Sequence, residues 1–225
     1  MKNISLIPAR KNSKGVTKKN KRLLGGIPLF AHSVNFSTQS KLIDKTVINS
    51  DDEDILNYCK TNYKKVDLFR RSKNLAEDST PMIDVLCDYL SNIDNNPEFI
   101  TLLQPTSPLR SQEDLNSMYK IINENPNIDC ITSIQEVPQH LSPYLMFHLN
   151  DDIMDPLFKE VPTRRQEVKT TFIRDGQIYI FRISSLLKNK KIITNQTYGY
   201  VSSIKGINID SEEDWSNAVK LFEDS

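Results

Sequence analysis

The sequence has few of the residues that form disulfides, zinc sites or catalytic triads. Its 225 residues include three cysteines and three histidines. Cys59, Cys87 and Cys130 form no Cys-x-x-Cys pair and lie in apolar surroundings, which predicts buried free thiols and a reducing, cytoplasmic location. The histidines show neither the spacing of metal ligands nor that of a Ser-His-Asp set. We therefore expect neither a Cys/His metal centre nor covalent catalysis.

Long apolar runs are also missing. No stretch approaches the length needed to span a membrane. After Lys2 the next charged residue is Arg10, which leaves too short an apolar run for a signal peptide. Hydrophobic residues make up 38% and charged residues 26% of the chain, which is sufficient for a globular core. We expect a single domain over residues 1–225 with no membrane partner.

Acidic residues are absent from residues 1–43, which carry nine Lys or Arg. Seven of these lie between Arg10 and Arg22, directly after an apolar run that predicts a buried strand. The whole chain has no net charge, so the remaining residues carry minus nine (20 basic residues against 29 acidic ones). Such a local patch indicates an anionic ligand such as a polyphosphate, or else a solvated basic face. It argues against nucleic acid as a partner, because nucleic acid favours a longer basic track.

Apolar runs alternate with amphipathic stretches along most of the chain. The pattern predicts strands at residues 4–7, 46–49, 66–69, 99–103 and 128–134, and helices at 28–38, 52–62, 81–93, 111–125 and 211–222. Such alternation predicts an α/β fold with a Rossmann-like, doubly wound, mostly parallel sheet. Ligands bind such sheets at the carboxyl ends of the strands, where Arg10, Ser50 and Gln104 fall.

Residues 137–170 interrupt this alternation. The segment contains Pro138, Pro143, Pro156 and Pro162 among polar residues. It predicts an excursion from the sheet, either an extended arm or a flap for dimerisation and for covering the substrate. Residues 172–181 then predict a hairpin whose turn lies at Asp175-Gly176.

Several short motifs follow one another along nearly the whole chain. They are Ile7-Pro-Ala-Arg-x-x-Ser-Lys-Gly15, Lys19-Asn20, Gly26-x-Pro-Leu29, Ser50-Asp51, Arg71-x-x-x-Leu75-Ala76-x-Asp78, Leu103-Gln-Pro-Thr-Ser-Pro-Leu-Arg110, Arg165-Gln166, Asp175-Gly-x-Ile-Tyr179 and Ile209-Asp210. Together they closely resemble the CMP-sialic acid synthetase (acylneuraminate cytidylyltransferase) family, which includes CMP-legionaminic and CMP-pseudaminic acid synthetases.

This resemblance implies the fold of the nucleotide-diphospho-sugar transferases and a cytidylyltransferase reaction. The anomeric hydroxyl of a nonulosonic (sialic-type) acid attacks the α-phosphorus of CTP, so that a CMP-sugar forms and pyrophosphate leaves. It further implies a homodimer and a Mg²⁺ or Mn²⁺ cofactor. Such a transfer needs reactants held in line and neutralised phosphate charge.

The resemblance also implies roles for individual residues. Arg10, Lys19 and Asp210 are expected to be catalytic. The residues expected to bind the nucleotide are Arg10, Ser13, Lys14, Gly15, Asn20, Arg71, Asp78 and Ser79, with Arg71 at the cytosine edge.

The sugar is expected to contact four residues, Gln104, Arg165, Gln166 and Tyr179. Arg165 is expected to meet a carboxylate, which a guanidinium binds with two hydrogen bonds, and to reach it from the partner subunit. For Tyr179 a place in the hydrophobic core is an equal alternative.

The expected metal ligands depart from the family pattern. Relatives commonly carry Asp-x-Asp before the last helix, whereas this chain has Asn208-Ile-Asp210. Asp210 can still bind a cation, since Mg²⁺ is often held by one or two carboxylates together with substrate phosphates. Asn208 offers only a neutral amide oxygen. The alternative is that Asp210 merely caps the helix that begins near Ser211.

Two other functions stay open at this stage. One is a sugar-1-phosphate nucleotidyltransferase, which would share the loop and the sheet. The other is a nucleotide-binding protein with weakened catalysis, which the Asn at position 208 motivates.

Overall fold

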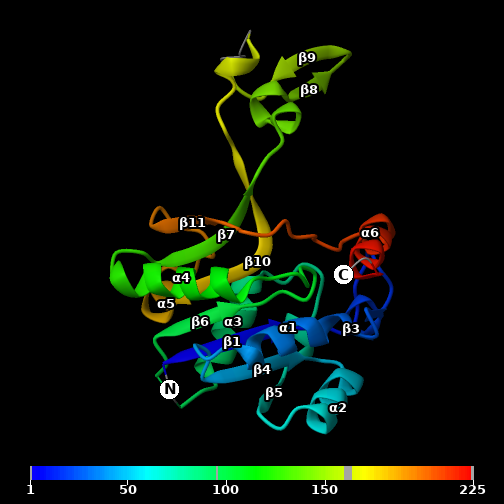
Figure 1. Ribbon diagram of the computed structural model, residues 1–225, viewed down its shortest axis with the longest axis vertical. Coiled ribbons are helices and arrows are strands. Elements are labelled where there is room, and N and C mark those ends of the chain that lie inside the picture. The colour runs from blue at the N-terminus through cyan, green and yellow to red at the C-terminus, as the bar shows by residue number, and fades with distance from the viewer. Residues whose placement is uncertain (1, 95, 160–163, 224–225) are drawn as a thin grey trace.

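A seven-stranded sheet forms the centre of the molecule in this computed structural model, which describes residues 2–94, 96–159 and 164–223 (Figure 1). The spatial order of the strands is β11 (Thr197–Val201), β7 (Cys130–Glu136), β10 (Phe172–Arg182), β6 (Phe99–Leu102), β1 (Asn3–Pro8), β4 (Lys45–Ser50) and β5 (Val66–Arg70). β10 runs antiparallel to β6 and β7, and the other neighbouring pairs are parallel. The prediction of an α/β fold with a mostly parallel sheet is confirmed.

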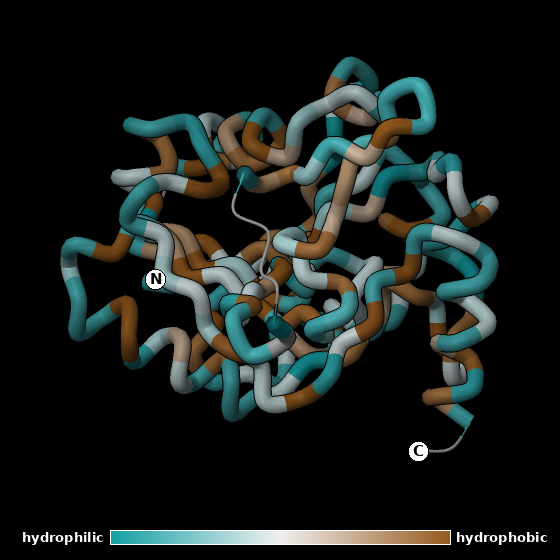
Figure 2. The backbone as a smooth tube through the Cα atoms, turned by 90° about the horizontal axis from the view of Figure 1, so that it is seen from above, coloured by the Kyte–Doolittle hydropathy of each residue, from teal (hydrophilic) through white to brown (hydrophobic). Residues whose placement is uncertain are grey.

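Helices cover both faces of this sheet. One face packs against α1 (Leu29–Gln39), α2 (Glu53–Asn62) and α4 (Gln112–Glu124), and the other against α3 (Met82–Ser91) and α5 (Ile183–Asn189). Along these helices hydrophobic residues alternate with hydrophilic ones (Figure 2), because only one side of each helix meets the sheet. No helix within the described residues is long and apolar enough to cross a membrane.

Local sequence explains where the central elements begin. All four residues of β6 are buried, as expected for a continuous apolar run in a strand covered on both faces. Two helices begin at side-chain caps: Asp52 accepts the backbone N–H of Asp54, and Ser111 accepts that of Asp114. Each such cap contributes about 1 kcal/mol. The helix predicted at 111–125 therefore begins at the Ser111 cap.

A separate hydrophobic cluster attaches the last helix to the basic loop. α6 (Glu212–Glu223) packs through Trp215 and Ala218 against Val16 and Leu24, with Ile209 buried between them. Leu24 belongs to a small hairpin of β2 (Leu23–Leu24) and β3 (Ile27–Pro28). This cluster holds together two segments that lie far apart in the sequence, one carrying Lys19 and the other Asp210.

Between β7 and β10 the chain leaves the sheet as a long arm (Figure 1). The arm carries an antiparallel hairpin of β8 (Phe147–Asn150) and β9 (Ile153–Pro156). Three short 3-10 turns complete its described part: η3 (Gln139–Leu141), η4 (Pro143–Leu145) and η5 (Arg165–Glu167).

The hairpin predicted at residues 172–181 is wrong. The segment is one strand, β10, with an irregularity between Arg174 and Tyr179 where its register against β7 shifts. Gly176 adopts a positive φ of 75° there, which glycine tolerates, and the Asp175 carboxylate accepts hydrogen bonds from Ser133 and from the Gln177 backbone. These bonds stabilise a bulge in place of a turn. The pattern also did not predict α5 and β11, which follow β10.

Candidate active site

A cleft opens at the carboxyl ends of the central strands. Arg10 follows β1, Arg71 follows β5 and Gln104 follows β6. The cleft is lined by Pro8, Arg10, Ser13, Lys19, Asn20, Arg71, Met82, Gln104, Pro105, Thr106 and Asp210. Residues predicted as catalytic, nucleotide-binding and sugar-binding thus meet in one place, as the rule for parallel sheets leads us to expect.

The basic loop is held in shape by hydrogen bonds of its own. The Asn20 amide donates to the carbonyl oxygen of Arg10 at 2.8 Å. The Ser13 hydroxyl donates to the carbonyl oxygen of Val16, whose side chain is fully buried. Lys19 and Asn20 form the 3-10 turn η1 (Lys19–Lys21) and are both buried. Ser13 and Asn20 therefore shape the loop, and they also line the cleft.

Gly15 lies against the backbone of Asp210. A Cβ atom on Gly15 would come within 1.8 Å of the Asp210 carbonyl oxygen. This space is too small for any side chain. Gly15 is not among the residues that line the cleft. Its contact with the nucleotide stays a prediction, and its observed role is to let the basic loop approach the segment that carries Asp210.

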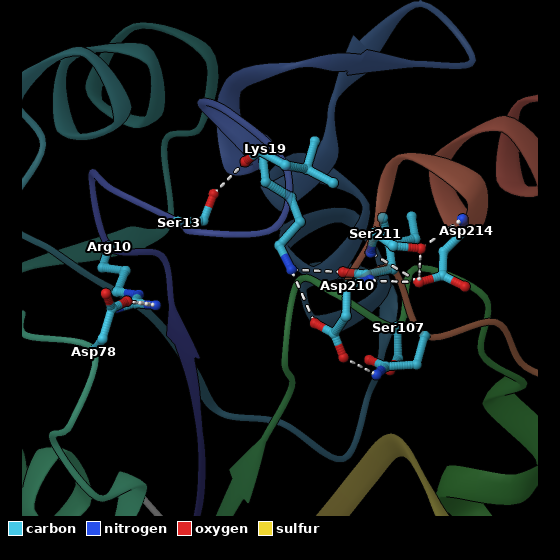
Figure 3. Close-up of polar contacts among 11 residues, drawn as sticks. Arg10, Ser13, Lys19, Asp78, Ser107, Asp210, Ser211 and Asp214 are labelled. Carbon is cyan, nitrogen blue, oxygen red and sulfur yellow. Dashed lines mark hydrogen bonds and ion pairs between the residues drawn. The ribbon is translucent and has the colours of Figure 1, made fainter.

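Lys19 and Asp210 form an ion pair at the cleft (Figure 3). The Lys19 Nζ atom lies 3.0 Å from Asp210 Oδ1 and donates a 2.5 Å hydrogen bond to the carbonyl oxygen of Ile209. The Lys19 side chain is 9% exposed, whereas that of Asp210 is 64% exposed. The ammonium group is thus fixed by the protein, while the carboxylate remains open to a ligand.

The cap of α6 does not use the Asp210 side chain. The Asp214 carboxylate accepts the backbone N–H groups of Asp210 and Ser211 at 3.0 and 2.8 Å, and the Ser211 hydroxyl accepts the N–H of Asp214 (Figure 3). Ser211 and Asp214 therefore form a reciprocal cap. This arrangement removes the alternative in which Asp210 serves only as a helix cap.

Asp210 and Asn208 fit a divalent cation only in part. The Asn208 amide nitrogen donates to Asp210 Oδ2, and the Lys19 ammonium donates to Asp210 Oδ1. Each carboxylate oxygen therefore already has one partner. No group of three or more His, Cys, Asp or Glu side chains suited to a metal occurs in the described part of the chain. One carboxylate and one amide that can turn its oxygen inward match Mg²⁺ or Mn²⁺ when phosphates supply further ligands.

Arg71 is buried at the base of the cleft. Its side chain is held by Asn49, whose amide oxygen accepts from Nε and whose backbone carbonyl accepts from Nη2 at 3.3 Å. Burial lowers the pKa of Arg71 to about 10, so the guanidinium stays charged at neutral pH. A rigid, cationic donor at this depth suits a polar ligand edge such as a base carbonyl.

Asp78 faces the basic loop and not the interior of the cleft. Its carboxylate forms an ion pair with Arg10 (Figure 3) and a second one, at 3.1 Å, with Lys14. It lines a neighbouring cavity, here named the side cavity, with Arg10, Asn12, Asp51, Lys73, Ala76 and Glu77. Ser79 is exposed beside it and lines neither the cleft nor the side cavity.

Gln104 is held in place through its backbone. The Arg110 guanidinium donates to the carbonyl oxygens of Gln104 and Gln177 at 2.5 and 2.6 Å, and to the Ser33 hydroxyl at 3.0 Å. Burial lowers the pKa of Arg110 to about 9. The partners of Arg110 are thus two carbonyls and a hydroxyl, with no carboxylate among these bonds.

Tyr179 is not at the cleft. It is 6% exposed and packs in the hydrophobic cluster beneath α3, stacked on Phe181 with ring centroids 6.1 Å apart. Because strand residues alternate between the two faces of a sheet, its place opposite Leu102 turns it into the core. The core alternative therefore describes the place of Tyr179 in this structure, while its contact with the sugar stays a prediction.

Arg165 and Gln166 lie in the arm, within η5, and a single chain does not bring them to the cleft. Gln166 is exposed, and the side chain of Arg165 lies outside the described residues. Sequence reasoning also missed Pro8, Met82, Pro105 and Thr106 as cleft residues. The signal that could have identified them was position: Pro8, Pro105 and Thr106 follow predicted strands, and Met82 lies at the start of the helix predicted at 81–93.

The model of the cytidylyltransferase family matches residues 4–221. The chain belongs to this family. Among curated relatives, an N-acylneuraminate cytidylyltransferase of Streptococcus agalactiae is 29% identical over 97% of the chain, and the chain spans only 53% of that protein's length. A CMP-N,N'-diacetyllegionaminic acid synthase of Legionella pneumophila is 28% identical, covering 99% of the chain and 97% of the relative.

Solved structures show the same fold. A CMP:2-keto-3-deoxy-manno-octonic acid synthetase complexed with CTP superimposes with a TM-score of 0.75 at 14% identity, covering 100% of this chain and 99% of that one. A cytidylyltransferase of Leptospira borgpetersenii superimposes with a TM-score of 0.66 at 19% identity, covering 100% and 88%. These similarities show the fold alone, a mostly parallel sheet with helices on both faces.

Proposed function

We propose that the chain transfers CMP from CTP to the anomeric hydroxyl of a nonulosonic acid and releases pyrophosphate. The observation that carries this proposal is the meeting of Arg10, Lys19 and Asp210 in one cleft of a cytidylyltransferase-family chain. The names of the similar proteins support the substrate class, since they include N-acylneuraminate, legionaminic acid and pseudaminic acid enzymes.

The cleft residues suit this transfer. The sugar hydroxyl oxygen bonds to the α-phosphorus, the bond from that phosphorus to the pyrophosphate oxygen breaks, and the hydroxyl proton passes to solvent. Arg10 and the fixed Lys19 ammonium neutralise charge on the phosphate oxygens, which fixed donors do without reorganisation. In this proposal Arg71 binds the cytosine edge, and Gln104, positioned by Arg110, binds the sugar.

A divalent cation, Mg²⁺ or Mn²⁺, would be held by the Asp210 carboxylate and by the Asn208 amide oxygen. When bound it would supply positive charge beside the phosphates. Lys19 remains beside the same carboxylate at 3.0 Å, so Asp210 orients the protein's own cation as well.

We also propose that the chain acts as a homodimer through the arm. The hairpin of the arm exposes Leu149, Ile153 and Met154 by 68%, 70% and 59%. Exposed apolar side chains gathered on one hairpin are typical of a contact between proteins. A second copy placed there would bring its arm, with Arg165 and Gln166, toward the cleft of the first, which a single chain leaves without them.

The experiment that tests this function is pyrophosphate release with each of the four NTPs, Mg²⁺ and a panel of nonulosonic acids, Kdo and sugar-1-phosphates. Release with CTP and one nonulosonic acid supports the proposal and identifies the substrate. Release only with a sugar-1-phosphate contradicts it and favours the sugar-1-phosphate nucleotidyltransferase. Asp210→Ala is the control, and we expect it to abolish release at any practical Mg²⁺ concentration. If the wild type binds CTP but no pair of substrates reacts, the protein is a nucleotide binder with weakened catalysis.

A further inference from the structure

The Asp78 carboxylate forms ion pairs with two basic residues at the start of the basic loop. It lies between η2 (Lys73–Leu75) and α3, and it forms ion pairs with Arg10 and with Lys14, the latter at 3.1 Å. These cations hold the pKa of Asp78 below its usual range, with Lys14 the larger influence. An acidic side chain therefore neutralises Arg10, which the proposed function assigns to the phosphates, and Lys14, which the family resemblance assigns to the nucleotide.

A carboxylate and a phosphate bind to the same hydrogen-bond donors of these cations. Both present oxygen acceptors to the flat edge of a guanidinium, which binds either of them with paired hydrogen bonds. Arg10 and Lys14 cannot satisfy Asp78 and a polyphosphate fully at the same time. A bound polyphosphate that uses these cations therefore has to displace Asp78.

The ion pair also separates two cavities. Arg10 lines both the cleft and the side cavity, whereas Asp78 lines only the side cavity. The bond from Arg10 to Asp78 thus stands at the boundary between them. Breaking it frees the Arg10 guanidinium for a ligand in the cleft.

The ion pairs of Asp78 are weak enough for a ligand to displace the carboxylate. The side chains of Lys14 and Asp78 are 81% and 35% exposed, and ion pairs between exposed groups are weak because water competes for both partners. The turn that carries Asp78 belongs to no helix or strand. Displacing Asp78 therefore requires no change in the sheet or the flanking helices.

We propose that Asp78 is an internal competitor of the polyphosphate, which sets how tightly Arg10 and Lys14 bind triphosphate and pyrophosphate. This inference rests on the proposed function for the identity of the ligand. Asp78 returns to the two cations when pyrophosphate leaves, so it weakens binding of that product. The competing interpretation is direct contact of Asp78 with the nucleotide, in which case its removal weakens binding.

The test uses inorganic triphosphate and pyrophosphate as probes, titrated into the full chain in a calorimeter with EDTA present, so that no metal contributes. We expect Asp78→Asn to bind both probes about three- to tenfold more tightly than the wild type, which corresponds to the loss of two exposed ion pairs. Glu77→Gln is the matched control: it removes one negative charge from the same cavity, and within the described residues Glu77 forms no ion pair. We expect its affinity to match the wild type.

A double-mutant cycle separates competition from a general effect of charge. Lys14→Ala is expected to weaken triphosphate binding more in the Asp78→Asn background than in the wild type, because only there is Lys14 free of its carboxylate. Unchanged or weaker binding by Asp78→Asn, or an equal gain in Glu77→Gln, would overturn the inference. If Asp78→Asn does not fold, Asp78→Ser takes its place in the same cycle. Because the probes need no turnover, the result is independent of whether the wild type makes a CMP-sugar.

Discussion

The backbone of Gly15 touches the carbonyl group of Asp210 so closely that a Cβ atom would stand 1.8 Å from the oxygen. Gly15 thereby fixes how near the basic loop comes to Asp210. We predict that Gly15→Ala displaces one segment from the other and lowers kcat/KM by about 100-fold, since misplacing reacting groups by about 1 Å has an effect of that size. Steady-state pyrophosphate release checks this, with circular dichroism to verify folding. Wild-type kinetics in a folded variant would contradict it.

A second prediction concerns Asn208, which donates its amide hydrogen to Asp210. Asn208→Asp replaces this hydrogen bond by two neighbouring carboxylates, which attract a divalent cation more strongly. We expect the Mg²⁺ concentration for half-maximal rate to fall several-fold, and Mn²⁺ bound in the presence of CTP to increase by electron paramagnetic resonance. If the change instead impairs both, Asn208 is adapted to this site and is not a weakened ligand.

Asp175 gives a prediction about stability. Its carboxylate accepts hydrogen bonds from Ser133, Ser202 and both the backbone and side chain of Gln177. Asp175→Ala leaves these donors without their acceptor, so we expect the free energy of unfolding to fall by about 2–4 kcal/mol. Urea denaturation measures this, with the exposed Glu124→Ala as control. A loss of less than about 0.5 kcal/mol, as at an ordinary surface position, would refute it.

The alternation of strands and helices was predictable because each element has its own pattern of apolar residues. The cleft was predictable for Arg10 and Gln104, because each follows a strand of the parallel sheet, whereas Ser50, predicted at the same edge, does not line it. Contacts between segments far apart in the sequence could not be predicted. Position 15 requires glycine because it packs against the backbone of Asp210, near the other end of the chain.

The sequence alone left two places open for the Tyr179 side chain, at the sugar or in the hydrophobic core. The bulge at Asp175 and Gly176 changes the register of β10, and this bulge depends on hydrogen bonds from β7 and from Ser202. The arm mixes polar and apolar residues without a clear period, so its hairpin of β8 and β9 could not be read from the pattern.

His32 predicts a dependence of stability on pH. Burial lowers its pKa below the ordinary value of 6.5, so the unfolded chain binds a proton more readily than the folded one. The free energy of unfolding therefore falls as the pH drops below about 6.5, until the folded-state pKa is reached. His32→Gln should reduce this fall between the two pKa values, as measured by urea denaturation across pH, whereas His148→Gln, exposed in β8, should retain it. Identical profiles for wild type and His32→Gln would contradict the prediction.

The fifth prediction is that the protein forms a dimer through the arm. We expect sedimentation to show a dimer for the wild type and a monomer for Ile153→Asp, because Ile153 is 70% exposed in the hairpin and a buried charge disrupts an apolar contact. Leu187→Asp is the control, since Leu187 is exposed on α5, outside the arm. A wild-type monomer, or equal dissociation of both variants, would rule out the arm as the interface.

The most direct test of the central claim is ³¹P NMR of the wild-type protein with CTP, Mg²⁺ and one nonulosonic acid at a time, with Lys19→Ala as the paired sample. The account predicts a new phosphodiester resonance from a CMP-sugar together with an equal amount of pyrophosphate in the wild type, and a strongly reduced rate in the variant. Consumption of CTP without any phosphodiester, or equal rates in both samples, would contradict it.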